Sequence, residues 1–94
     1  MFEVRIQGDG GVKLIGRLDA SGADAAADAL AELDGGLALD CAELDYISSA
    51  GLAVLVATYK RLLGGGHRLR LVNVPPHIRN VLRFASLDSI FLID

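Results

Sequence analysis

The feature that most constrains the fold is the way in which segments with the apolar spacing of strands alternate along the chain with segments that have the apolar spacing of helices. Short glycine-rich stretches separate several of these segments. Apolar residues that alternate with polar ones are typical of strands, and apolar residues that recur every three or four positions are typical of helices. The periods predict strands at 2–7, 12–18, 37–41, 69–74 and 90–93 and helices at 23–33, 52–63 and 75–85. The order is β-β-α-β-α-β-α-β, which predicts an α/β protein.

This order predicts a mostly parallel mixed sheet with an N-terminal antiparallel hairpin and with helices covering the sheet. Gly8-Asp9-Gly10-Gly11 supplies the turn of the hairpin. The strand at 2–7 has one apolar face, which indicates an edge position, with Ile6 among its buried residues. The run Leu37–Cys41 is almost continuously apolar, which is typical of a central strand buried on both faces. With 94 residues and no linker or repeat, the chain is expected to form one domain, 1–94.

Charge and hydropathy narrow the classes of partner. The net charge is −3 and no basic run occurs, so we expect no direct contact with nucleic acid. The arginines are densest at 68–83, where they form either the solvated ends of a strand and a helix or a small patch facing a partner. The apolar stretch Ala50–Ala57 is about a third of a membrane span, and the N-terminus lacks the order of a signal peptide. We expect no membrane insertion and a cytoplasmic location.

Catalytic machinery is not recognisable in the sequence. His67 and His77 have no partner at metal-ligand spacing, so we expect no metal and no cofactor. The segment 48–51 is not a nucleophile elbow, because no glycine stands two positions before either serine. The glycine run 64–66 follows a helix, whereas a phosphate loop precedes one. We therefore expect no enzyme. Cys41 is predicted to be a buried, small apolar side chain.

The segment Ser48-Ser49-Ala50-Gly51 is the candidate functional site. It lies between an apolar strand and the most regular amphipathic helix, at the carboxyl edge of the predicted sheet, where ligands and partners dock. Its glycine permits close approach of another backbone. The residues alone leave two interpretations open. One serine caps the helix, a contribution of about 1 kcal/mol, or the segment forms a contact surface.

Three stretches together resemble the STAS family. The segment Leu44–Leu55, which contains Ile47-Ser48-Ser49-Ala50-Gly51, resembles the family signature. Leu14–Asp19 is similar to the end of the family's second strand, and Val74–Leu87 is similar to its last helix and the start of its closing strand. The three stretches agree in order and spacing, and the resemblance covers essentially the whole chain. It implies a single STAS-like domain.

The resemblance also implies a function, that of an anti-sigma factor antagonist. Such a protein is a phosphorylation-switched module that docks an anti-sigma factor serine kinase, a histidine-kinase-like ATPase, and so releases a sigma factor. A phosphatase is a further expected partner. The family motif commonly reads Asp-Ser-Ser/Thr-Gly, and its first serine is phosphorylated; matched by position, that serine is Ser49. The partner-binding surface implied by the family consists of Asp19, Asp40, Ser48, Ser49, Ala50 and Gly51.

Two residues of this segment depart from the motif. Ser48 stands where the family has Asp, and Ala50 stands where it has a second hydroxyl residue. The alternative is a STAS subunit of a bacterial lipid-transport ABC complex, which rests on the ATPase subunit and needs no phosphorylation. A chemotaxis or stressosome module is a third interpretation. The identity of the bound ATPase would separate the first two.

Overall fold

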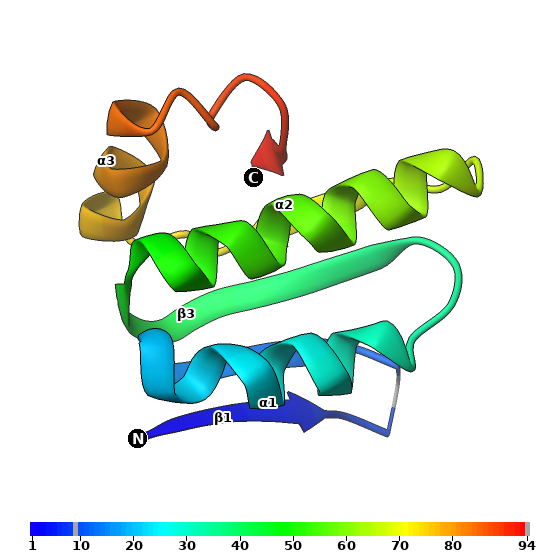
Figure 1. Ribbon diagram of the computed structural model, residues 1–94, viewed down its shortest axis with the longest axis horizontal. Coiled ribbons are helices and arrows are strands. Elements are labelled where there is room, and N and C mark those ends of the chain that lie inside the picture. Colours follow the sequence, from blue (N-terminus) through cyan, green and yellow to red (C-terminus); the bar gives the residue numbers. More distant parts are fainter. Residues whose placement is uncertain (9, 94) are drawn as a thin grey trace.

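The computed structural model describes residues 1–8 and 10–93. Its elements are β1 (Phe2–Ile6), β2 (Val12–Leu18), α1 (Ala20–Ala31), β3 (Leu37–Ile47), α2 (Ser49–Gly64), β4 (Leu69–Val72), α3 (Pro76–Phe84) and β5 (Leu92–Ile93), as Figure 1 shows. The predicted order of strands and helices is confirmed. Asp9, a member of the predicted turn, lies outside the described residues.

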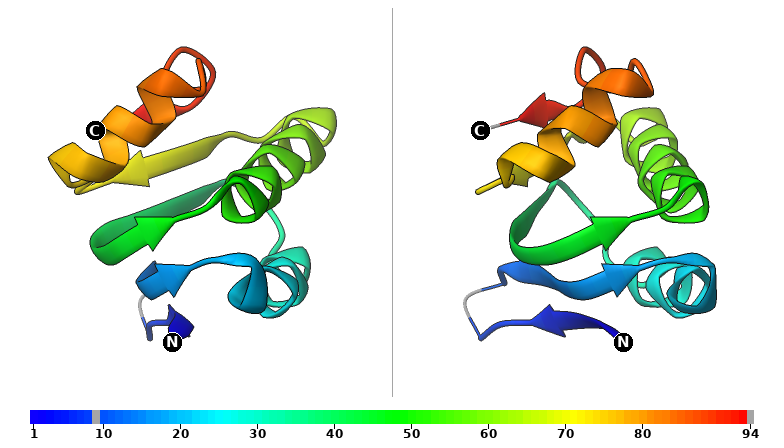
Figure 2. Two further views of the ribbon diagram at one scale, coloured as in Figure 1. Left: turned by 60° about the vertical axis from the view of Figure 1, so that its left-hand side comes forward. Right: turned by 90° about the vertical axis from the view of Figure 1, so that its left-hand side faces the viewer.

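The described strands form one sheet in the order β1-β2-β3-β4-β5. β1 and β2 pair antiparallel and the other neighbours pair parallel, so the mixed sheet with an N-terminal hairpin and the edge position of β1 are confirmed. Because the strand order follows the chain order, right-handed crossovers place successive helices on the same side of the sheet. Figures 1 and 2 show α1 and α2 side by side against that face, with α3 near β4.

Only one face of the central strand is buried. Leu37, Leu39 and Cys41 of β3 are buried, whereas Ala38 is exposed and Asp40 is half-buried. The prediction of a strand buried on both faces is wrong, because the helices leave the second face to solvent. Polar side chains occupy that face, where for example the Lys13 ammonium lies 3.3 Å from the Glu43 carboxylate.

β3 is longer than its sequence pattern predicts. The prediction ended the strand at residue 41, but it continues to residue 47. The pairing of β3 with β2 contains two register shifts, and at each shift β3 has one more residue than β2. Each additional residue moves the alternation by one position. The buried residues Cys41, Leu44 and Ile47 are consequently three apart, and a search for a period of two does not find them.

The core lies between the sheet and the helices and is built mainly of aliphatic side chains. Tyr59 of α2 meets Phe91 edge to face, with 5.8 Å between the ring centres. Ile6, which the alternation of β1 assigned to the buried face, is 56% exposed near the end of this edge strand. The largest side chains that are almost completely buried are Leu14, Leu18, Leu30, Leu39, Leu44, Leu55, Leu62, Leu69, Leu71, Ile78 and Leu82.

Candidate functional site

Two helices begin next to each other at the carboxyl ends of β2 and β3. The last residues of these strands, Leu18 and Ile47, are register partners. The Ser48 amide donates a hydrogen bond of 2.9 Å to the Leu18 carbonyl. Asp19 and Ser48 are each the first residue after their strand and the N-cap of the following helix. The parallel pairing therefore brings both predicted polar residues to one edge.

Asp19 caps α1 with a single carboxylate oxygen. Its Oδ1 accepts hydrogen bonds from the Ser21 hydroxyl at 2.7 Å, the Ser21 amide at 3.1 Å and the Gly22 amide at 3.3 Å. These bonds, with the Ser21 hydroxyl first among them and with a contribution from the Arg17 charge, lower the pKa of Asp19. Asp19 therefore carries a negative charge at neutral pH.

Ser48 and Ser49 have different roles at the start of α2. Ser48 is half-buried, and its hydroxyl accepts the Gly51 amide at 3.3 Å, so the predicted cap is Ser48. Ser49 is the first residue of the helix and is exposed. Its hydroxyl has no hydrogen-bond partner among the described residues. The side chain of Ser49 is thus accessible to another molecule.

Gly51 allows the first turn of α2 to pack against both strand ends. The residue is buried, and a Cβ atom on it would lie 2.7 Å from Leu18 Cγ and 2.8 Å from Ile47 Cγ1. It would also lie 2.8 Å from the Leu18 carbonyl oxygen. The backbone that this glycine admits is therefore that of the same chain. Ala50 is half-buried beside it.

Asp40 lies away from this edge. The prediction placed it at the end of its strand, but it lies inside β3, about 20 Å along the strand from Ile47. Its Oδ1 accepts the Ala42 amide at 3.0 Å and the Asn73 side-chain amide at 3.2 Å, which connects β3 to the residue after β4. Of the predicted partner-binding residues, the structure brings together Asp19, Ser48, Ser49, Ala50 and Gly51 and leaves Asp40 apart.

Two contacts near the same edge do not follow from the periods of the sequence. The guanidinium carbon of Arg17 lies 4.3 Å from the centre of the Tyr46 ring, a cation–π contact between register partners. His77 Nε2 lies 2.8 Å from the Asp45 carbonyl oxygen and ties the start of α3 to the end of β3. The period of two places Arg17 on the exposed face of its strand. Its partner follows from the register between strands, which the sequence does not specify.

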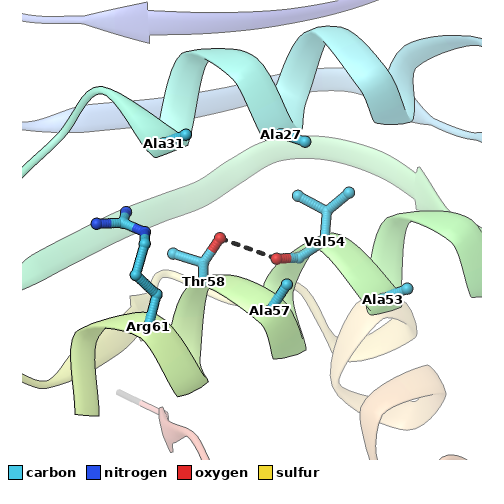
Figure 3. Close-up of a pocket in the computed structure, with 7 residues that line it drawn as sticks. All are labelled: Ala27, Ala31, Ala53, Val54, Ala57, Thr58 and Arg61. Carbon is cyan, nitrogen blue, oxygen red and sulfur yellow. Dashed lines mark hydrogen bonds between the residues drawn. The ribbon is translucent and has the colours of Figure 1, made fainter. Parts of the chain in front are cut away.

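A mostly apolar groove of about 370 Å³ lies between α1 and α2. Figure 3 shows Ala27 and Ala31 of α1 facing side chains from α2. The Arg61 guanidinium donates to the Leu30 carbonyl at 2.8 Å, close to the end of α1. The buried Thr58 hydroxyl donates to the Val54 carbonyl at 2.8 Å. The other lining residues from α2 are Ala53 and Ala57.

The described residues offer no metal site, since no three His, Cys, Asp or Glu side chains gather there as a metal ion requires. None of the helices in the same residues combines the length and apolar composition of a membrane span. The prediction that Cys41 is buried is confirmed. Its burial, with a smaller effect of the Asp40 charge, raises the pKa of the thiol to about 12, so the thiol is neutral near pH 7.

Comparison with known proteins gives relatives by sequence. Residues 2–94 match a family model described as "Mlab, STAS domain". BtrV of Bordetella bronchiseptica, named as a candidate anti-sigma factor antagonist, is 40% identical over 68 residues. That match covers 69% of this chain, and the chain spans 59% of the length of BtrV.

Solved structures share the fold. An anti-sigma factor antagonist from Mycobacterium paratuberculosis superposes with a TM-score of 0.80 at 27% identity, covering 99% of this chain and 83% of the other. The phosphorylated form of SpoIIAA from Bacillus superposes with a TM-score of 0.71 at 17% identity, covering 100% of this chain and 91% of SpoIIAA. At this identity the likeness shows a shared fold and nothing about function. The family match over almost the whole length and the shared fold lead to one conclusion: this chain belongs to the STAS family.

Proposed function

We propose that this chain is an anti-sigma factor antagonist, a non-catalytic module of the cytoplasm that acts by binding another protein. The observation that carries the proposal is the exposed Ser49 hydroxyl at the first position of α2, with the capping role taken by Ser48. Support comes from the sequence relative BtrV and from the Mycobacterium paratuberculosis antagonist, which shares the fold. The expected partner is an anti-sigma factor serine kinase, a histidine-kinase-like ATPase.

The proposed docking surface is the Ser49 edge, which we define as Asp19, Ser48, Ser49, Ala50 and Gly51. The kinase would contact this edge and the following turns of α2. This contact would release the sigma factor that the kinase holds. Asp40 belongs to the same interface if the partner extends about 20 Å along β3. A phosphatase that restores Ser49 completes the proposed cycle.

Phosphorylation of Ser49 would change the interface more than the fold. The phosphate adds a charge of about −1.5 to −2 at pH 7. The amides of Ser49 and Ala50 belong to the first turn of α2 and have no acceptor among the described residues, and they can stabilise an anion together with the helix dipole. Ser48 carries no charge, so it does not repel the phosphate as a neighbouring Asp would. A partner fitted to a neutral hydroxyl would meet a larger, charged group.

Binding measurements test this switch. Mass spectrometry of the protein from its own cells should find phosphate on Ser49. In calorimetric titration with the captured kinase, Ser49→Asp should weaken binding at least about tenfold, whereas Ser49→Ala, which adds no charge, should stay within about threefold of the parent. Equal affinity of Ser49→Asp and the parent would contradict the switch.

A second candidate is the STAS subunit of a lipid-transport ABC complex. The replacement of the motif's Asp and second hydroxyl residue by Ser48 and Ala50 favours this phosphorylation-independent role. Affinity capture from the native cell separates the candidates. A histidine-kinase-like ATPase on the Ser49 edge supports the antagonist, and an ABC ATPase there supports the transporter subunit.

A further inference from the structure

The outer side of α3 presents an exposed aromatic ring beside two exposed arginines. Phe84 is 84% exposed, more than any other large apolar side chain that the structure describes except the N-terminal Met1. Arg79 and Arg83 are exposed one helical turn apart, and neither has a carboxylate within ion-pair distance in the described part of the chain. Arg83 donates a hydrogen bond of 2.9 Å to the Asn80 side chain. Aromatic and arginine side chains in this combination are typical of protein interfaces.

α1 presents the opposite charge beside the groove described above. Asp24 and Asp28 are exposed one turn apart, and over 1–8 and 10–93 neither has a cation within ion-pair distance. The helix contains no basic residue. Ala27 and Ala31, which line the groove, follow Asp24 and Asp28 by three positions, so each alanine neighbours an aspartate on the helix surface. On its α1 side the groove therefore has an apolar floor and an acidic rim, and the Arg61 guanidinium lies near the end of α1.

We propose that the groove between α1 and α2 binds α3 of a second copy of this chain. Residues four apart on a helix rise by about 6 Å, so the Arg79–Arg83 pair has the same spacing as the Asp24–Asp28 pair. If α3 of one copy lies parallel to α1 of the next, the two arginines face the two aspartates. Phe84, which follows Arg83 by about 100° around its helix, then falls on the Ala27 side of α1, over the groove.

Size and charge favour a second copy as the occupant. The groove of about 370 Å³ exceeds the roughly 150 Å³ of a protein cavity that accepts benzene, so it has room for the Phe84 ring. Like charges one turn apart on α1, and again on α3, repel each other within one molecule, and docking would relieve both repulsions. Because the two surfaces differ, the contact is head-to-tail and leaves one groove and one α3 free in each dimer. This self-association lies outside the proposed function.

Sedimentation velocity from about 10 µM to about 1 mM at low salt tests the contact. The weight-average mass should rise above the 9.9 kDa of the monomer and fall back when salt screens the charges. Phe84→Ala should raise the dissociation constant at least about tenfold. Leu63→Ala, which truncates another exposed apolar side chain (45% exposed) on α2, should leave it unchanged. Circular dichroism should show the parent fold in each variant.

Mixing experiments test the head-to-tail geometry. The Asp28→Arg variant loses a functional groove but keeps its α3 surface, and the Phe84→Ala variant loses its α3 surface but keeps the groove. An equimolar mixture of the two variants should therefore form dimers and nothing larger. Exchange of charges within one chain, Asp28→Arg with Arg83→Asp, should restore the association that either single change removes. A parent protein that stays monomeric up to about 1 mM would overturn the proposal, as would a Phe84→Ala variant that associates like the parent.

Discussion

Asp19 and Ser48 begin α1 and α2 from equivalent places on neighbouring strands, yet only Asp19 carries a charge. Each accepts an amide from the first turn of its helix, which satisfies a donor that the helix itself cannot satisfy. The apolar periods predicted helix starts at 23 and 52, each three residues later than the starts that the structure shows, because the first turn of each helix carries few apolar residues. The sequence left open which of the two serines caps α2, and the structure assigns the cap to Ser48.

Ser48→Ala should destabilise the protein without changing Ser49. Loss of the cap is expected to lower the free energy of unfolding by about 1 kcal/mol and the melting temperature by about 4 to 8 °C. Ser49→Ala is the matched control, since the Ser49 hydroxyl has no hydrogen-bond partner among the described residues; its melting temperature should lie close to that of the parent. Calorimetry measures both. Equal melting temperatures of the Ser48→Ala variant and the parent would contradict the assignment of the cap.

The lowered pKa of Asp19 predicts a loss of stability in acid. Because the folded state favours the carboxylate, the unfolded state binds more protons once the pH falls below the ordinary value of 3.8. The contribution of Asp19 is therefore present above about pH 4 and is lost as the pH falls through its lowered folded-state pKa. Asp19→Asn keeps a capping oxygen but does not titrate, so its urea unfolding should depend less on pH in this range. Ser21→Ala, which removes the 2.7 Å hydrogen bond, should reduce the dependence in the same direction.

At the scale of elements, the placement of α2 depends on one glycine, Gly51, which has no side chain. Gly51 lets the helix begin against the ends of β2 and β3, so the exposed Ser49 is held on a rigid support. The same helix forms one wall of the groove that we propose to bind α3. The sequence indicated a glycine for close approach but not which backbone approaches, because the contact with Leu18 joins residues far apart in the chain.

Gly51→Ala should test this packing. A Cβ atom would contact Leu18 and Ile47 at less than 3 Å, so the variant should lose about 1 to 3 kcal/mol of stability in urea unfolding. Gly64→Ala is the matched control at the other end of α2, where a Cβ atom meets nothing within 4 Å. That variant should be as stable as the parent or gain up to about 1 kcal/mol, because alanine favours the helix. Similar stabilities of the two variants would be inconsistent with the close packing of α2.

At the scale of the whole molecule, Cys41 reports on the opening of the core. Its side chain is 1% exposed, and its thiol has a pKa of about 12, so the native protein should react very slowly with iodoacetamide near pH 7. In concentrated urea the same thiol should react at the rate of an ordinary cysteine. Mass spectrometry of the alkylated protein measures both rates, and fast labelling of the native state would contradict the buried position.

The same thiol predicts a loss of stability in alkali. The pKa of the thiol is raised in the folded state. Below about pH 9 the thiol is protonated in both the folded and the unfolded state, so its ionisation does not lower the free energy of unfolding. From about pH 9 to about 12 the unfolded chain ionises first, and stability should fall. Cys41→Ala removes this titration and should show a smaller decline in urea unfolding across the same range. An equal decline in the two proteins would contradict the raised pKa.

The sequence by itself determined the order of strands and helices, the presence of a serine cap at the start of α2 and the buried Cys41, because local periods and capping chemistry act between residues close in the chain. Only the tertiary structure decided the length of β3 and the place of Asp40. Register shifts between distant strands move the alternation, and sequence periods contain no information about register. The structure also decided that one face of the sheet stays exposed, because coverage follows from the side on which the crossovers pass rather than from the apolar content of a strand.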